Sequence, residues 1–137
     1  MSVRSIPLLV FVFLAYNLIV LFAGGVKPYE VLEFKVLIVP MMTGFWELTT
    51  GDLLVLSLFV LMFFELLKST YTSSISLLDH ALSMILFVIC LVEFLLLPQA
   101  HTSVFFFVVV GSLIDVIAGY TIGIRVARRD FTIGNNP

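Results

Sequence analysis

The sequence has one cysteine and few charged residues, and both scarcities exclude classes of protein. Cys90 has no second cysteine to pair with, so a disulfide framework within the chain is excluded. Its apolar neighbours indicate a small core residue. Only 12% of the residues are charged, with seven Lys and Arg against nine Asp and Glu. No basic run offers a surface for nucleic acid, so we expect no such partner.

Motifs for catalysis and cofactor binding are also missing. The chain has no His/Cys set at metal-ligand spacing, no Gly-rich phosphate loop, no G-x-S-x-G and no H-E-x-x-H. An enzyme acting on lipid or quinone would need a reactive pair, for which Asp79 with His80 and Glu93 with His101 are the candidates. Adjacent helical residues point about 100° apart, which argues against pairing Asp79 with His80. We expect no enzymatic activity, no metal and no cofactor.

The chain is rich in long hydrophobic stretches. It is 61% hydrophobic with a mean hydropathy of +1.21, values that exclude a soluble domain. Four stretches approach the roughly 20 residues that cross a bilayer as a helix. They are residues 6–23, 53–67, 77–97 and 104–124. The sequence predicts an all-α integral membrane protein, one domain over residues 1–137, built as a bundle of four transmembrane helices.

Local signals mark the ends of these helices. Gly24 and Gly25 suit the stop of the first helix. Asp52 is the predicted N-cap of the second, and Asp79 caps the third or lies in its first turn. Pro98 ends the third helix.

The first apolar stretch has a second interpretation. Arg4, the apolar run and the small residue Ala23 are typical of a cleaved signal peptide. The run is long for that purpose and contains Tyr16 and Asn17, which favours a transmembrane helix.

The distribution of basic residues predicts the orientation. Lys and Arg concentrate in short cytoplasmic loops of membrane proteins. With both termini in the cytoplasm, five basic residues are inside and two are outside. The five are Arg4, Lys68, Arg125, Arg128 and Arg129, and the two are Lys27 and Lys35.

Residues 26–51 are too many for a simple turn. Alternation over residues 30–38 predicts an irregular or short β connection on the extracytoplasmic side, a weak strand or hairpin punctuated by Pro40. Phe45 and Trp46 are typical of anchors at a membrane interface. Two interpretations stay open, a cap or docking strand and a plain connector.

The fourth stretch carries Gly111, Asp115, Gly119 and Gly123 at a spacing of four, so they share one helix face, with Ser112 beside it. Small residues let another helix approach closely. A carboxylate in mid-membrane is costly unless it faces protein or a water-filled cavity. We expect this glycine line to be the inward helix-packing face and a surface for self-association.

The third stretch carries a second polar stripe. Its two acids, a Ser and a Cys fall on one helix face, which we expect to pack against the glycine line. The stripe is Asp79, Ser83, Leu86, Cys90, Glu93 and Leu97.

Depth separates the two buried acids. A rise of about 1.5 Å per residue places Glu93 about 6 Å and Asp115 about 18 Å from the outer edge, so they cannot pair. Asn17 lies within a turn or so of Asp115 in depth and is its predicted partner. Asp115, Glu93 and Asn17 are the candidate ion path, with packing as the alternative role.

Five charged residues fall near the cytoplasmic edge. Glu65 and Lys68 are three apart on one helix and can pair. Asp79, His80 and Arg125 lie at a similar depth. The cluster fits an ion-pair network that fixes helix packing, or a proton entry site at His80, which titrates near neutral pH.

Several short motifs resemble those of a family of small, uncharacterised four-helix inner-membrane proteins of bacteria. The resemblance covers most of the chain beyond Gly44 and implies the four-helix architecture and a bacterial inner membrane. It implies no activity and no site. The motifs are Gly44-Phe45-Trp46-Glu47, Gly51-Asp52, Asp79-His80-Ala81-Leu82-Ser83-Met84, Val92-Glu93-Phe94-Leu95-Leu96, Asp115-Val116-Ile117-Ala118-Gly119 and Ala127-Arg128-Arg129-Asp130.

Two functions are therefore expected ahead of an enzyme. The first is a non-enzymatic inner-membrane subunit that contacts the lipid bilayer and joins copies of itself or a larger membrane complex, through the Gly111–Gly123 face or through lipid-facing Phe-rich surfaces. The second is a small oligomeric proton or cation channel or transporter that uses Asp115 and Glu93.

Overall fold

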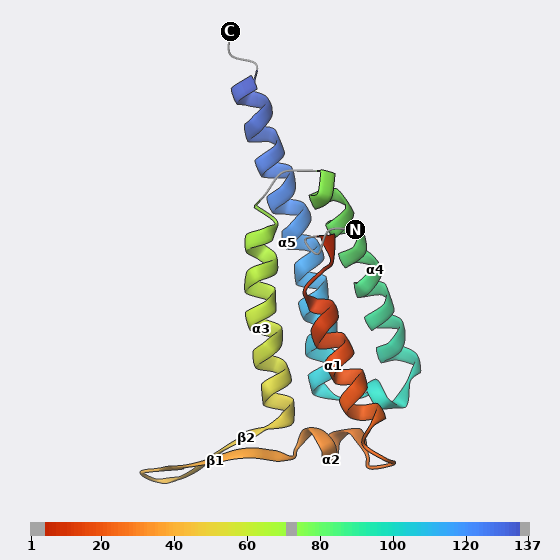
Figure 1. Ribbon diagram of the computed structural model, residues 1–137, viewed down its shortest axis with the longest axis vertical. Helices are drawn as coiled ribbons and strands as arrows, with labels where there is room; N and C mark the ends of the chain where they lie inside the picture. The colour runs from red at the N-terminus through yellow and green to blue at the C-terminus, as the bar shows by residue number, and fades with distance from the viewer. Residues whose placement is uncertain (1–4, 71–73, 135–137) are drawn as a thin grey trace.

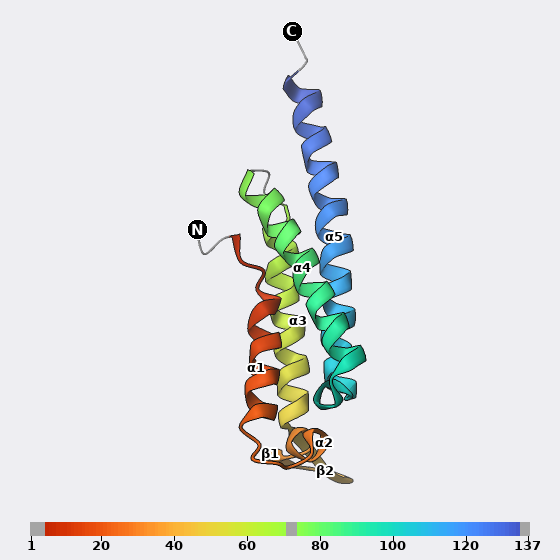
Figure 2. The same cartoon turned by 90° about the vertical axis from the view of Figure 1, so that its right-hand side faces the viewer.

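The computed structural model describes residues 5–70 and 74–134. Arg4, which the orientation count uses, lies outside these residues. Side chains are not described for residues 74–76, 126, 127, 130 and 133, which takes in Ala127 and Asp130 of the last motif. The chain is mostly helical, and four helices stand side by side with a small sheet across one end (Figures 1 and 2).

The long elements follow the predicted order. Helix α1 is Leu9–Leu21, α3 is Thr50–Lys68, α4 is Ser74–Leu96 and α5 is Ser103–Gly134. Between α1 and α3 lie the short helix α2, Pro28–Leu32, and the strands β1, Lys35–Met41, and β2, Gly44–Thr49. One turn of 3₁₀ helix, Pro98–Ala100, joins α4 to α5.

Among residues 5–70 and 74–134, three helices are long and apolar enough to cross a membrane. Their apolar spans are Thr50–Lys68, Leu77–Leu96 and Ser103–Arg125. Such helices indicate a membrane protein. The shorter α1 is apolar apart from Tyr16 and Asn17, and its 13 residues are fewer than the predicted range of 6–23.

One prediction about the helix ends is confirmed, and those for Asp52 and Asp79 are wrong. Gly24 and Gly25 have φ of 62° and 89° just beyond α1, as a glycine stop requires. The N-cap of α3 is Thr49 rather than Asp52, because the helix starts earlier than predicted. Asp52 is the third helical residue and completes a capping box with Thr49. Asp79 lies well inside α4, which begins at Ser74, so it neither caps this helix nor lies in its first turn.

The predicted hairpin exists, but its bounds differ. Residues 28–32 form α2 instead of a strand, since Pro28 favours the first turn of a helix. Pro40 lies within β1 and does not end it. Strands β1 and β2 pair antiparallel from Lys35↔Thr49 to Met41↔Gly44. The hairpin, residues 35–49, is called the arm below; the bundle end that carries it is the arm end.

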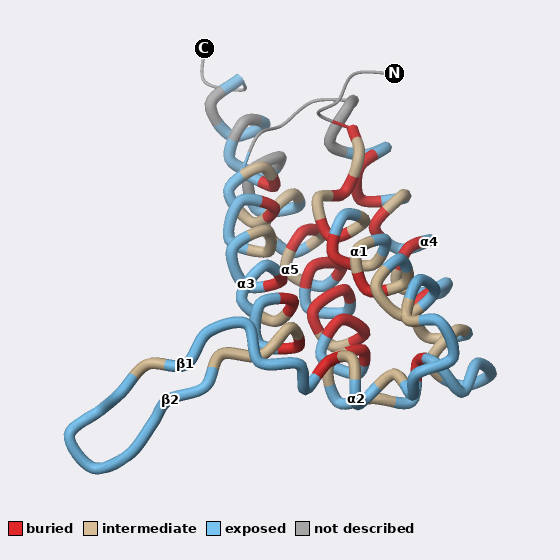
Figure 3. The backbone as a smooth tube through the Cα atoms, turned by 60° about the horizontal axis from the view of Figure 1, so that its bottom comes forward, coloured by how far each residue is buried: buried red, intermediate tan, exposed pale blue. Residues whose placement is uncertain are grey.

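Helix α5 is the centre of the bundle. It contacts each of α1, α3 and α4, and its apolar span is the most buried of the three. Figure 3 shows buried backbone concentrated where these helices face one another and an exposed arm. The apolar core comes from all four long helices, with one residue each from α2 and the 3₁₀ turn. Its members are Leu9, Val12, Tyr16, Leu32, Leu54, Leu58, Leu86, Cys90, Ala100, Phe105, Val108 and Val109.

Candidate functional site

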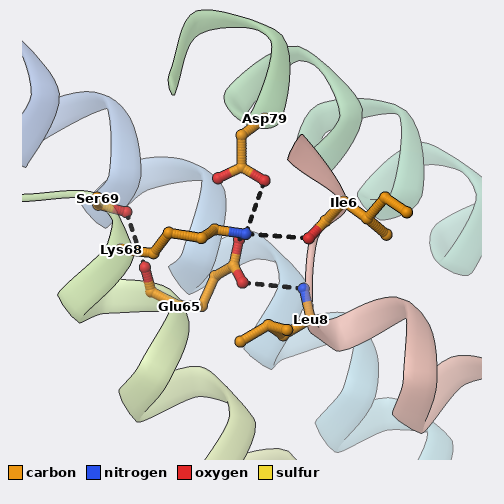
Figure 4. A network of polar contacts seen from close by, with 6 residues as sticks. All are labelled: Ile6, Leu8, Glu65, Lys68, Ser69 and Asp79. Carbon is orange, nitrogen blue, oxygen red and sulfur yellow. Dashed lines mark hydrogen bonds and ion pairs between the residues drawn. The ribbon is translucent and has the colours of Figure 1, made fainter. Parts of the chain in front are cut away.

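The most concentrated polar group in the bundle is centred on Lys68. Its Nζ lies 3.0 Å from Glu65 Oε1 and 2.9 Å from Asp79 Oδ1 (Figure 4). It also donates a hydrogen bond to the backbone oxygen of Ile6 at 3.0 Å. One ammonium group therefore joins α3 to α4 and to the segment that leads into α1.

Glu65 extends this group to the start of α1. Its Oε2 accepts a hydrogen bond from the backbone N–H of Leu8 at 2.9 Å. The first N–H groups of a helix have no partner within the helix, and a carboxylate there is favourable. Ile6, Leu8, Glu65, Lys68 and Asp79 together are called the Lys68 clamp.

The two clamp carboxylates are withdrawn from solvent. Glu65 is 1% and Asp79 is 3% exposed, whereas the Lys68 side chain is 21% exposed. A buried ion pair loses hydration, and removing one partner leaves a charge that nothing compensates. The predicted pairing of Glu65 with Lys68 is present, and Asp79 joins it.

Asp115 lies near the clamp and not alone at mid-bundle. It is 3% exposed and makes a hydrogen bond with the Ser83 side chain of α4. Asp79 and Lys68 act on it electrostatically, and Asp115 in turn acts on Glu65. Three buried carboxylates thus share the field of one lysine.

The predicted partnership of Asn17 with Asp115 is wrong. Asn17 Nδ2 lies 3.4 Å from Glu93 Oε2 and also donates to the backbone oxygen of Phe13 at 3.1 Å. Because α1 ends at Leu21, Asn17 is about 6 Å from its last residue, near the arm end. Glu93 lies at the same end of α4, and its Oε1 is buried without a hydrogen-bond partner among the described residues.

The glycine line packs against α4, as predicted, and Leu58 of α3 is a further partner that was not predicted. A Cβ on Gly111 would meet Leu58 of α3 at 2.9 Å. A Cβ on Gly119 would lie 2.8 Å from Nδ1 of His80, and one on Gly123 would lie 3.2 Å from its Nε2. The line is therefore occupied by Leu58 and His80 of the same chain, which leaves it unavailable for self-association.

His80 is held in this slot by its surroundings. It is 7% exposed, and its ring centroid is 5.2 Å from that of Tyr120. Within residues 5–70 and 74–134, no group hydrogen-bonds its buried Nε2. Arg125 is exposed and does not share this buried environment, so the predicted five-residue cluster is gathered only in part.

The predicted stripe of α4 does face inward over most of its length. Asp79, Ser83, Leu86 and Cys90 are buried, Glu93 is half-buried, and Leu97 is exposed beyond the helix end. Opposite it, Ser112 is 1% exposed and interacts with Cys90 through a side-chain hydrogen bond. Polar groups thus recur along the contact of α4 with α5.

One buried polar contact was missed by sequence reasoning. The Tyr16 hydroxyl donates to the backbone oxygen of Gln99 at 2.7 Å and lies 2.7 Å from Thr102 Oγ1. Tyr16 is fully buried, so these contacts satisfy its only polar atom. Its partners are more than 80 residues away in the chain, and no local pattern points to them.

The described residues offer no metal centre. Within this part of the chain, no three His, Cys, Asp or Glu side chains are grouped so as to hold a metal ion. A cavity of ≈ 370 Å³ opens at the arm end between α2 and the first turns of α3 and α5. Its polar lining residues are Tyr29, Glu33, Thr49, Asp52, His101, Thr102 and Ser103.

Comparisons with known proteins give no relative. Searches of protein-family models, of curated proteins and of solved structures find no match to this chain. The residues of the chain itself are therefore the basis on which its function is inferred.

Proposed function

We propose that the protein is a non-enzymatic membrane subunit that self-associates or serves as an accessory subunit of a larger membrane complex. The observation that carries this proposal is the Lys68 clamp. Glu65, Lys68 and Asp79 join α1, α3 and α4 to one another. Because these charged side chains bind one another, they hold the bundle together. The outer surface of the bundle is then the part that contacts other molecules.

The proposed topology is four transmembrane helices with both termini in the cytoplasm of a bacterium and the bundle in the inner membrane. The excess of Lys and Arg at the ends of α3 and α5 supports the orientation. The apolar α1 packs against α3 and α5, which supports its place in the membrane. The motif resemblance supports the inner membrane.

The surface best suited to contact a neighbour lies on α3. Of the three long apolar spans, this one is the least buried, at 22% against 44% for α5. Its inner side, with Leu54 and Leu58, is buried. Its outer side carries apolar residues that are about half exposed, called the α3 ridge: Leu56, Phe59, Val60, Phe63 and Leu67.

The spacing of the ridge favours helix pairing. Leu56, Val60, Phe63 and Leu67 are separated by four, three and four residues, the period of a left-handed helix pair. Transmembrane helices associate by packing of such faces, because lipid tails are as apolar as leucine. The glycine line is already filled, so we place association on the α3 ridge.

The mass of the protein extracted from native membranes into lipid nanodiscs tests this proposal. A stoichiometric second protein, or a defined number of copies, is the expected result. The variant Phe59→Ala/Phe63→Ala should lower the assembled fraction, whereas Phe106→Ala/Phe107→Ala on exposed positions of α5 should not. A bare monomer from native membranes would refute the proposal.

A second candidate is favoured by a different observation. Asp115, Glu65 and Asp79 are three buried carboxylates beside one lysine, and Ser83, Cys90 and Glu93 continue polar groups toward the arm end. Intramembrane acids of this kind mark proton and cation pathways in many membrane proteins. We therefore also propose, as the alternative, a small oligomeric proton or cation channel or transporter.

Purified protein in liposomes distinguishes this alternative. A proton or cation flux that Asp115→Asn abolishes, and that Glu30→Gln at an exposed position leaves unchanged, would support transport. The absence of any flux of protons, Na⁺ or K⁺ from well-incorporated protein would exclude it for these ions.

A further inference from the structure

The arm projects sideways from the foot of α3, across the direction of the helices and beyond the edge of the bundle (Figures 1 and 3). Strands of this length extend about 23 Å, about twice the diameter of a helix. Outside the hairpin itself, its main contact is with α3, which continues β2 directly. The arm therefore covers little of its own chain.

The strand register separates the arm into two unlike faces. Cross-strand partners lie on the same side of a sheet, and alternate residues along a strand share a side. The pairs Leu37↔Leu48, Val39↔Trp46 and Met41↔Gly44 thus belong to one face, here the apolar face. The pairs Ile38↔Glu47 and Pro40↔Phe45 belong to the other, here the charged face.

A register shift completes this separation. Between Lys35 and Leu37 the pairing shifts by one residue, so Lys35 pairs with Thr49 and not with the apolar face. Lys35 then reaches Glu47, with Nζ 2.7 Å from Oε1. The apolar face consequently carries no charged or polar side chain, while Leu37, Met41 and Trp46 on it are about half exposed.

Such a hairpin is not a stable element in water by itself. A two-stranded hairpin is marginal in water, and exposed apolar strands with free edges invite aggregation. The hydrocarbon core is equally unsuitable, because the free edges present backbone N–H and C=O groups that lipid cannot satisfy. The headgroup layer suits both parts of the arm. Water reaches the free strand edges there, and the acyl chains begin on one side, where they cover the apolar side chains.

The position of the arm in the chain agrees with this layer. Strand β2 ends at Thr49, and the apolar span of α3 begins at Thr50. The arm thus leaves the bundle at the level where the lipid-facing surface ends, and aromatic residues such as Trp46 are enriched at that level. We propose that the arm binds the surface of the same bilayer, lying flat in the lipid headgroup layer with its apolar face toward the acyl chains.

Trp46 is the only tryptophan of the chain, so the native protein carries its own probe on the apolar face. The protein is reconstituted at high lipid ratio into vesicles of phosphatidylcholine and phosphatidylglycerol that contain lipids brominated at a chosen acyl carbon. We expect the bromine nearest the headgroup to quench Trp46 emission about twofold more than bromine near the chain end, as for a residue at the interface.

Three results would overturn the proposal. Quenching by aqueous iodide without quenching by brominated lipid would place the arm in water. Protection from both quenchers would show that a protein covers it. Strongest quenching by bromine at the chain end would place it in the hydrocarbon core.

A matched variant tests which face is which. Phe45 neighbours Trp46 but belongs to the charged face, so Phe45→Trp combined with Trp46→Phe moves the probe across the sheet. We expect about twofold more quenching by iodide and about twofold less by brominated lipid than in the native chain, because successive side chains of a strand point to opposite faces and position 45 then faces water. Equal quenching of both proteins would refute the assignment of the faces. This inference does not depend on the proposed function, because a nanodisc that holds only a monomer leaves it intact.

Discussion

The imidazole of His80 fills the space that Gly119 leaves open on α5. A methyl group on Gly119 would lie 2.8 Å from Nδ1, closer than real side chains approach. Tyr120 packs against the same ring, so His80 has little freedom to withdraw. The contact of α4 with α5 at this point therefore requires both the glycine at position 119 and the ring of His80.

Gly119→Ala should destabilise the protein by about 1–3 kcal/mol through overpacking, an effect that the better helix propensity of alanine offsets only in part. Thermal unfolding in a mild detergent, followed by loss of the monodisperse peak, measures it. Gly44→Ala is the control, because a Cβ there meets nothing within 4 Å. In the double variant with His80→Ala, the penalty of Gly119→Ala should shrink; if it is unchanged, the His80 contact is not its cause.

Lys68→Met should be the most damaging single change to the clamp. It leaves Glu65 and Asp79 buried without a positive partner, which costs about 3–5 kcal/mol. The same unfolding assay measures the loss. Lys35→Met removes an exposed ion pair of the arm and should cost less than about 1 kcal/mol. Restoration of stability by adding Glu65→Gln and Asp79→Asn to Lys68→Met would identify charge as the cause, and a failure to restore any stability would contradict it.

Tyr16→Phe should cost about 1–2 kcal/mol, because it removes a buried hydrogen bond to Gln99 and leaves Thr102 Oγ1 with one partner fewer. The comparison of midpoint temperatures with Tyr29→Phe, at a half-exposed ring, provides the control. Equal midpoints for the two variants would mean that the Tyr16 hydroxyl contributes nothing to the connection of α1 with the α4–α5 turn.

The proposed topology is open to labelling, because Cys90 is fully buried and gives a low background. Thr43→Cys at the tip of the arm should react with a membrane-impermeant maleimide in intact cells. Gly134→Cys at the end of α5 should react only after the membrane is permeabilised. The opposite pattern would invert the orientation, and reaction of both in intact cells would exclude an odd number of crossings between them, such as the three of α3, α4 and α5.

The elements were predictable because their signals are local. Gly24 and Gly25 stop α1, Pro98 follows α4, and the alternation after residue 34 produces the arm. The inward stripe of α4 was likewise predictable from helical spacing alone. The start of α3 was placed too late because Thr49, the last residue of β2, is also the N-cap, and Asp52 completes the capping box from the third helical position.

The contacts of the site were less predictable, since they depend on how far each helix extends and rotates. The depth estimate paired Asn17 with Asp115, whereas α1 ends at Leu21 and brings Asn17 to Glu93. The pairing of Glu65 with Lys68 was predictable because both lie on one helix. The backbone groups of Ile6 and Leu8 in the clamp carry no sequence signature at all.

The Lys68 clamp also bears on how the chain is assembled in the membrane. Its parts come from the first, third and fourth helices of the sequence, so it closes only after α4 has entered beside α3. Until then, Lys68 lacks its contact with Asp79, whereas its contact with Ile6 and the contact of Glu65 with Leu8 need only α1 and α3. A chain arrested before α4 therefore presents an incomplete clamp at the membrane, a mark by which proteases of the membrane can tell an unfinished bundle from a complete one.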